Sequence, residues 1–121
     1  MKQEENKYEV LARLTLENAR QTVADDFLLN VSAQLAKESI QWSFVGMLAN
    51  QGINPPDHND LEALYKQVQP YLDHQLDESV IKKLIQNNFL NPEGHEVEMG
   101  DAEGFLEVAE RLYFYTNNNH R

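Results

Sequence analysis

The sequence contains no cysteine, no long hydrophobic run and few basic residues. Without cysteine, the chain can form neither a disulfide framework nor a thiolate metal site. A membrane-spanning helix needs about 20 consecutive apolar residues, and no such run is present. The first ten residues, MKQEENKYEV, are too polar for a secretory signal. We therefore expect a cytoplasmic protein without membrane association.

The small number of basic residues also argues against one class of function, nucleic-acid binding. Ten Lys and Arg residues stand against twenty Asp and Glu residues, which gives a formal net charge of −10. Proteins that bind a phosphate backbone usually present clustered Lys and Arg, but no basic run exceeds Lys82-Lys83. The charge therefore disfavours generic nucleic-acid binding, and the simpler interpretation is that the acidity maintains solubility. The length of 121 residues with 41% hydrophobic residues predicts one globular domain.

A central helix is expected between Asp25 and Gly52, because this stretch has helical periodicity. At about 100° per residue it carries two apolar stripes on opposite sides. One stripe contains Leu28, Val31, Leu35, Trp42, Val45 and Ala49, and the other contains Ala33, Ala36, Ile40, Phe44 and Met47. Two stripes indicate that the helix is covered on both sides. We expect Asp25 or Asp26 to cap its start and Gly52 to close its end.

Four further helices are predicted from periodicity and capping residues. They lie at about Lys7 to Val23, over LEALYKQV after Asp60, after Asp77, and from about Asp101 to Tyr115. The fold class is therefore all-α, with no substantial sheet. We expect a disordered N-terminus at residues 1–6, one helical domain at residues 7–116 and a polar tail at residues 117–121. The predicted core contains Leu11, Leu14, Ile40, Phe44, Leu61, Leu64, Leu84, Phe105 and Leu112.

Two segments resemble a known family. The stretch AKESIQWSFVGMLANQGINPPDHNDLEAL is similar to the middle of a HEPN domain, and DAEGFLEVAERLYFYT is similar to its last helix. The resemblance extends over about residues 8–116. It implies an up-and-down bundle of four to five helices that is commonly a homodimer. Such domains are often encoded beside a minimal nucleotidyltransferase, as its toxin, antitoxin or substrate-binding partner. Some members are metal-independent ribonucleases that use Arg and His with four to six residues between them, and others bind nucleotides or act as scaffolds.

This sequence departs from the ribonuclease pattern of the family. Arg111 and His120 are the nearest candidates, and eight residues separate them. On a regular helix they would point in roughly opposite directions. The loop histidine of the family falls on Asn59, while His58 stands one residue earlier. We therefore predict no catalytic residue, although a divergent ribonuclease remains an alternative.

Asp57, His58 and Asp60 are the first candidates for a site, in the loop that precedes the LEALYKQV helix. A carboxylate, imidazole and carboxylate set can hold a divalent metal or perform acid–base chemistry. The alternative, which we favour, is that the two aspartates make turn and helix-cap hydrogen bonds. No metal or cofactor is predicted.

The central helix supplies the remaining candidates, Lys37, Glu38 and Trp42. Lys37 and Glu38 lie between the two apolar stripes, where they either line a groove for a ligand or partner, or form a solvent-facing pair at its rim. Trp42 belongs to the stripe that is expected to meet a symmetry mate in a homodimer. The alternative is that the first or last helix of the same chain covers Trp42.

Taken together, these features predict a non-catalytic binding module that dimerises. It would engage a partner protein, such as a minimal nucleotidyltransferase of a toxin–antitoxin pair, or a nucleotide. One alternative is the divergent metal-independent ribonuclease. The other is an acidic protein that mimics nucleic acid and inhibits an enzyme with a basic surface, which the net charge alone supports.

Overall fold

The computed structural model describes residues 7–24, 28–72, 76–87, 89 and 97–118, with side chains up to residue 114. These residues form an all-α fold, as predicted. Its elements are α1 (Lys7–Val23), α2 (Leu29–Asn50), α3 (Leu61–Val68), the short 3₁₀ helix η2 (Gln69–Tyr71), α4 (Glu78–Gln86) and α5 (Met99–Asn118). The expected disordered segment, residues 1–6, lies outside the described residues.

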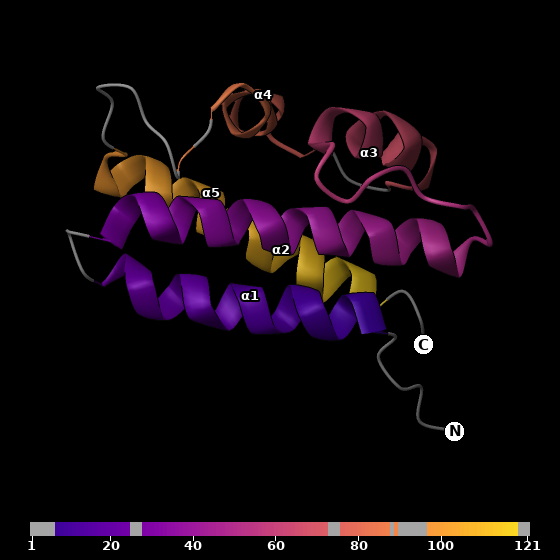
Figure 1. Cartoon of the computed structure of the whole chain (residues 1–121), viewed down its shortest axis with the longest axis horizontal. Coiled ribbons are helices and arrows are strands. Elements are labelled where there is room, and N and C mark those ends of the chain that lie inside the picture. The colour runs from indigo at the N-terminus through magenta and orange to yellow at the C-terminus, as the bar shows by residue number, and fades with distance from the viewer. Residues whose placement is uncertain (1–6, 25–27, 73–75, 88, 90–96, 119–121) are drawn as a thin grey trace.

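Three long helices build the frame of the molecule. Helices α1 and α2 lie side by side and antiparallel, and α5 runs behind both of them (Figure 1). The short helices α3 and α4 lie on the opposite side of α2 from α1, and α4 is viewed nearly end-on in Figure 1 because it crosses the long helices. The central helix α2 contacts α1, α3 and α5. Its stripe with Ala33, Ala36, Ile40, Phe44 and Met47 is buried, but Leu28 and Val31 of the other stripe are 38% and 37% exposed. The expectation that the described part of the chain covers both stripes is therefore wrong for the second one.

Local chemistry explains where several helices begin and end. Gly52 has a positive φ of 72°, which glycine adopts without steric cost. The Gly52 N–H donates to the Ala49 carbonyl and the Ile53 N–H donates to the Leu48 carbonyl, which is the Schellman arrangement at a helix C-terminus. The predicted closure by Gly52 is confirmed. The expected caps Asp25 and Asp26 lie outside the described residues.

Small side chains line the contact between α1 and α2. The Ser39 hydroxyl donates to the Ala12 carbonyl at 2.8 Å, and the Ser32 hydroxyl donates to the Ala19 carbonyl at 2.9 Å. All four residues are fully buried. Because a helix backbone is reached directly by a serine side chain of its neighbour, the two helices approach closely along this contact.

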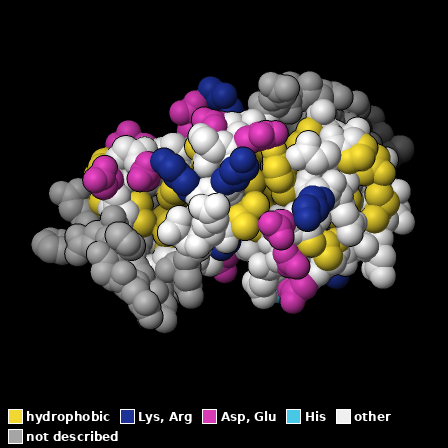
Figure 2. Space-filling view, turned by 90° about the horizontal axis from the view of Figure 1, so that it is seen from above, with side chains coloured by type: hydrophobic (Ala, Val, Ile, Leu, Met, Phe, Trp, Pro, Cys, Tyr) yellow, Lys and Arg dark blue, Asp and Glu magenta, His cyan; other side chains and the backbone are white. Residues whose placement is uncertain are grey.

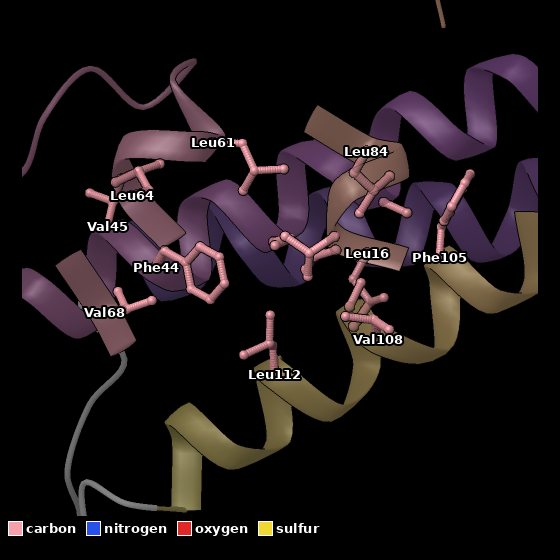
Figure 3. Packing of buried hydrophobic residues seen from close by; sticks show 14 of the residues in the cluster. Leu16, Phe44, Val45, Leu61, Leu64, Val68, Leu84, Phe105, Val108 and Leu112 are labelled. Atoms are coloured by element: carbon pink, nitrogen blue, oxygen red, sulfur yellow. The ribbon is translucent and has the colours of Figure 1, made fainter. Parts of the chain in front are cut away.

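The hydrophobic core lies between α2, α5 and the two short helices. Figure 3 shows Phe44 of α2 pointing toward Leu112 of α5, with Leu64 and Val68 of α3 nearby. Large side chains from all five α-helices belong to this single cluster. The predicted core residues Ile40, Phe44, Leu61, Leu64, Leu84, Phe105 and Leu112 are buried.

The core prediction is wrong for two residues. Leu11 and Leu14 are 37% and 46% exposed, because α1 turns the opposite face toward the core. The buried residues of α1 are Glu9, Ala12, Leu16 and Ala19. The last helix also differs from the prediction: α5 begins at Met99 and continues to Asn118, so part of the expected polar tail at residues 117–121 is helical.

The surface over α3 and α4 carries mixed charge. Figure 2 looks onto this side and shows Lys and Arg side chains next to Asp and Glu side chains, with hydrophobic side chains between them. None of the described helices combines the length and apolar character that would let it cross a membrane.

Candidate functional site

The loop between α2 and α3 gathers all six candidate residues at one place. After the turn at Gly52, the chain runs back along α2 until Asp60 caps α3. The buried Gln41 side chain donates from Nε2 to the Asn59 carbonyl at 3.4 Å, which joins the loop to α2. This return brings Asp57, His58 and Asp60 close to the part of α2 that bears Lys37, Glu38 and Trp42.

Three rings form a stack at the centre of this region. The His58 imidazole lies on the Trp42 indole with a centroid distance of 4.4 Å and an interplanar angle of 11°. The Tyr8 ring of α1 stacks on Trp42 at 6.0 Å and 16°, and Lys7 Nζ lies 5.0 Å from the centroid of Tyr8. Trp42 is half-buried as a result. Tyr8 of α1 therefore covers part of Trp42. This agrees with the alternative that the first helix of the same chain covers this residue.

A surface pocket of about 390 Å³ adjoins the stack. Side chains of α2, the loop, α3 and α4 form its wall, namely Lys37, Asp57, Asn59, Asp60, Leu61, Glu62 and Ile85. Three carboxylates and one ammonium group therefore face this pocket, with Leu61 and Ile85 as its apolar part. Such a wall is unfavourable for a phosphate group, because the carboxylates repel an anion more than a single lysine attracts it.

The two loop aspartates have structural hydrogen bonds. Asp57 Oδ1 accepts from the Asn59 N–H at 3.0 Å, and Asp60 Oδ1 accepts from the Ala63 N–H at 3.1 Å as the cap of α3. His58 Nδ1 lies 3.7 Å from Asp57 Oδ1. Within the described part of the chain, no three His, Asp or Glu side chains come together as metal ligands. The favoured interpretation of turn and cap hydrogen bonds is therefore confirmed for both aspartates.

Burial changes the ionisation of the two charged residues of α2. Partial burial lowers the pKa of Lys37, because desolvation disfavours the ammonium form. Its Nζ donates to the Asn87 carbonyl at 3.3 Å. Burial raises the pKa of Glu38, and the charge of His58 acts in the opposite direction. Both side chains are half-buried, so they are part of the wall between α2 and its neighbours rather than a fully solvated pair.

The residues of a family-type nuclease centre are not assembled in the described structure. Arg111 lies exposed on α5, where its guanidinium pairs with Glu107 at 2.6 Å. His120 lies outside the described residues. His58 faces Trp42 and Asp57.

Sequence reasoning did not assign six contributors to the site: Tyr8, Gln41, Asn59, Leu61, Glu62 and Ile85. A partial signal existed for Gln41, which stands four residues after Lys37 and therefore shares its side of the helix. Tyr8 follows the helical spacing of Leu11 and Leu14, which does not identify its partner. Tyr8 meets Trp42, and Ile85 lies beside the loop, only because the helices pack together. No local sequence pattern predicts these two contacts.

A comparison with protein-family models found a match to the HEPN domain over residues 11–118. The matched range includes Trp42, the loop and all of α3, α4 and α5. Neither the curated proteins nor the solved structures gave a match to the chain.

Proposed function

Because the chain belongs to the HEPN family, we propose that it is a non-catalytic binding module that forms a homodimer and engages a partner protein. A minimal nucleotidyltransferase is the partner that the family resemblance suggests. The observation that carries the proposal is an uncovered apolar surface on α1 and α2. We call this surface the outer face, and its exposed apolar residues are Leu11, Leu14, Leu28 and Val31.

The outer face lies on the side of α1 and α2 that is opposite α5. In Figure 1, α5 lies behind the helix pair, and no described helix lies on the near side. Leu28 and Val31 continue along α2 into the half-buried Leu35 and Trp42. The spacing of three, four and seven residues is that of the apolar positions in helix bundles. A second helix pair can therefore pack against this surface with regular interdigitation of side chains.

The outer face is also nearly free of charge. Its other exposed positions on α1 include Asn18 and Gln21, whereas Arg20 of the same helix pairs with Glu110 of α5. Depletion of charged residues marks the core of protein interfaces. A second copy of this chain is the occupant we propose, because an uncharged contact surface adds no local like-charge repulsion to that between two molecules of net charge −10.

Light scattering at micromolar concentration tests the dimer. We expect a mass of about 28 kDa, twice the 14.0 kDa of one chain. The variants Leu14→Glu and Val31→Glu should be monomeric, because a two-fold axis brings the new carboxylates together. Phe114→Glu is the matched control, since Phe114 is an exposed apolar residue of α5 outside the outer face; it should remain dimeric. A monomeric wild type, or variants that keep the dimer mass, would contradict the proposal.

The non-catalytic role is supported by the pairing of Arg111 with Glu107 and by the missing Arg and His spacing. A metal-independent ribonuclease needs a base for the 2′-hydroxyl and a cation for the phosphate charge. Purified protein should leave structured and unstructured RNA intact. Cleavage that disappears in Arg111→Ala or His58→Ala would instead support the ribonuclease alternative.

The pocket beside Trp42 is the second surface we propose for a partner. Its three carboxylates favour a basic protein segment over a nucleotide phosphate. Where a minimal nucleotidyltransferase is encoded beside this chain, co-purification of the two proteins tests the assignment. Asp57→Asn with Glu62→Gln should weaken the complex, and Phe114→Glu should not.

A further inference from the structure

The stack of His58 on Trp42 joins the α2–α3 loop to the side of α2. The two rings are nearly parallel and 4.4 Å apart. The neighbouring hydrogen bond from Gln41 to the Asn59 carbonyl is long, at 3.4 Å, so it is a weak restraint. The ring contact is therefore a major tether of this part of the loop.

Charged groups surround the imidazole unevenly. Asp57 Oδ1 lies 3.7 Å from Nδ1 on the loop side. From α2, the Glu38 carboxyl interacts electrostatically with His58. From α1, the Tyr8 ring stacks on the indole, and the Lys7 ammonium lies over the Tyr8 ring. The pocket adds Lys37 of α2 together with Asp60 and Glu62 at the start of α3. Two carboxylates, those of Asp57 and Glu38, thus act on the imidazole directly.

We infer that the contact between His58 and Trp42 is a pH-sensitive latch that holds the α2–α3 loop against α2. When His58 is protonated, the imidazolium is attracted by the indole face, as cations are by aromatic rings, and by Asp57 and Glu38. When it is neutral, these attractions disappear and only ring stacking remains. Histidine is the side chain that changes charge between about pH 5 and 8, so the loop is held more tightly at the acidic end of this range.

The latch controls the pocket because the same loop forms part of the pocket wall. Asp57, Asn59 and Asp60 all contribute to that wall, and His58 lies between them in the sequence. Loosening of the stack would change the position of these side chains and expose Trp42. What the pocket binds depends on the proposed function, but the latch itself does not, since it is a property of the unbound chain.

The single tryptophan of the chain gives a direct readout. A protonated imidazole in contact with an indole quenches its fluorescence. The emission of Trp42 should therefore fall as the pH decreases from 8 to 5, with one titration step. Acrylamide should quench Trp42 more strongly at pH 8 than at pH 5, because the loosened loop exposes the indole.

His58→Gln is the test variant, and it should abolish both pH dependences. His74→Gln is the matched control, which removes a different histidine of the chain, and it should titrate like the wild type. Asp57→Asn keeps an oxygen that can accept the Asn59 N–H but removes the charge, so the difference in acrylamide quenching between pH 8 and pH 5 should be smaller than in the wild type. A wild-type emission that does not change with pH, or a His58→Gln variant that titrates unchanged, would overturn the latch. Because the proposed dimer surface continues into Trp42, the same measurements on Leu14→Glu separate the latch from dimerisation, and the latch predicts the same pH dependences in that variant.

Discussion

Helix α1 has two apolar faces that differ in the size of their side chains and in what covers them. The inward face presents Ala12 and Ala19, which are fully buried against α2. The outward face presents the larger Leu11 and Leu14, which remain exposed. Small side chains allow the two backbones to approach until serine hydroxyls reach carbonyl groups of the neighbouring helix. Leu16 is also buried on the inward side, so the size of the side chain does not decide which residues of α1 are buried.

The largest difference between inward and outward positions should appear for phenylalanine. Phe44 is fully buried among α2, α3 and α5, whereas Phe114 is 53% exposed on α5. Phe44→Ala should reduce the free energy of unfolding by about 3–5 kcal/mol, because it removes buried apolar surface and leaves a cavity. Phe114→Ala should change it by less than about 0.5 kcal/mol. Urea denaturation followed by circular dichroism measures both, and equal losses would show that this distinction is wrong.

The next largest difference in the free energy of unfolding is expected when leucine is introduced on each of the two faces of α1. Ala12→Leu inserts a large side chain where Ser39 contacts the α1 backbone, and overpacking of this kind costs about 1–3 kcal/mol. Asn18→Leu places leucine at an exposed position of the same helix and should cost less than about 0.5 kcal/mol. The same denaturation experiment compares them. A stable Ala12→Leu protein would mean that α1 and α2 are not closely packed.

Local chemistry accounts for the parts of the fold that were predicted from sequence. Gly52 ends α2 because its positive φ suits glycine, and Asp60 and Asp77 cap α3 and α4 through a side-chain oxygen. Each of these features depends on residues within a few positions of one another. The all-α class follows from the same short-range patterns.

The orientation of α1 could not be predicted in this way. Periodicity identifies an apolar stripe but does not decide which of two stripes faces the core. Alanine and serine give a weaker hydrophobic signal than leucine, so Leu11 and Leu14 were assigned to the core and the small-residue contact was missed. In the candidate site, the α2 residues and the loop residues were each recognised. Their meeting at Trp42 depends on how the loop folds back, which no local pattern specifies.

Hydroxyl groups on α1 and α2 provide a smaller test of the same comparison. Ser39 donates across the helix contact to Ala12, whereas Thr15 donates to the Leu11 carbonyl within its own helix. Ser39→Ala should lose about 0.5–1.5 kcal/mol, the net value of a typical buried hydrogen bond. Thr15→Ala should be neutral or slightly stabilising, because alanine has the higher helix propensity. A loss for Thr15→Ala as large as that for Ser39→Ala would remove the distinction between inward and outward positions.

The smallest expected effect concerns Glu38, the charged residue of α2 beside the outer face. Burial raises the pKa of its carboxyl in the folded protein. At pH values between the ordinary pKa and the raised pKa, the folded protein therefore binds more protons than the unfolded chain. The contribution of Glu38 to the free energy of unfolding consequently falls as the pH rises through this range. The cost persists at neutral pH. Glu38→Gln should consequently gain stability over the wild type at pH 7 and gain little at pH 4, where both states are largely protonated.

Two variants decide whether this gain comes from burial of Glu38. Glu103→Gln, at an exposed position of α5, is the matched control and should show no such difference between the two pH values. Because the charge of His58 lowers the pKa of Glu38, the gain from Glu38→Gln should be larger in a His58→Gln background. Urea denaturation at both pH values measures these differences. If Glu38→Gln instead loses stability at pH 7 in both backgrounds, the Glu38 carboxylate is stabilised in the folded protein. The surface beside the outer face would then tolerate charge better than its composition indicates.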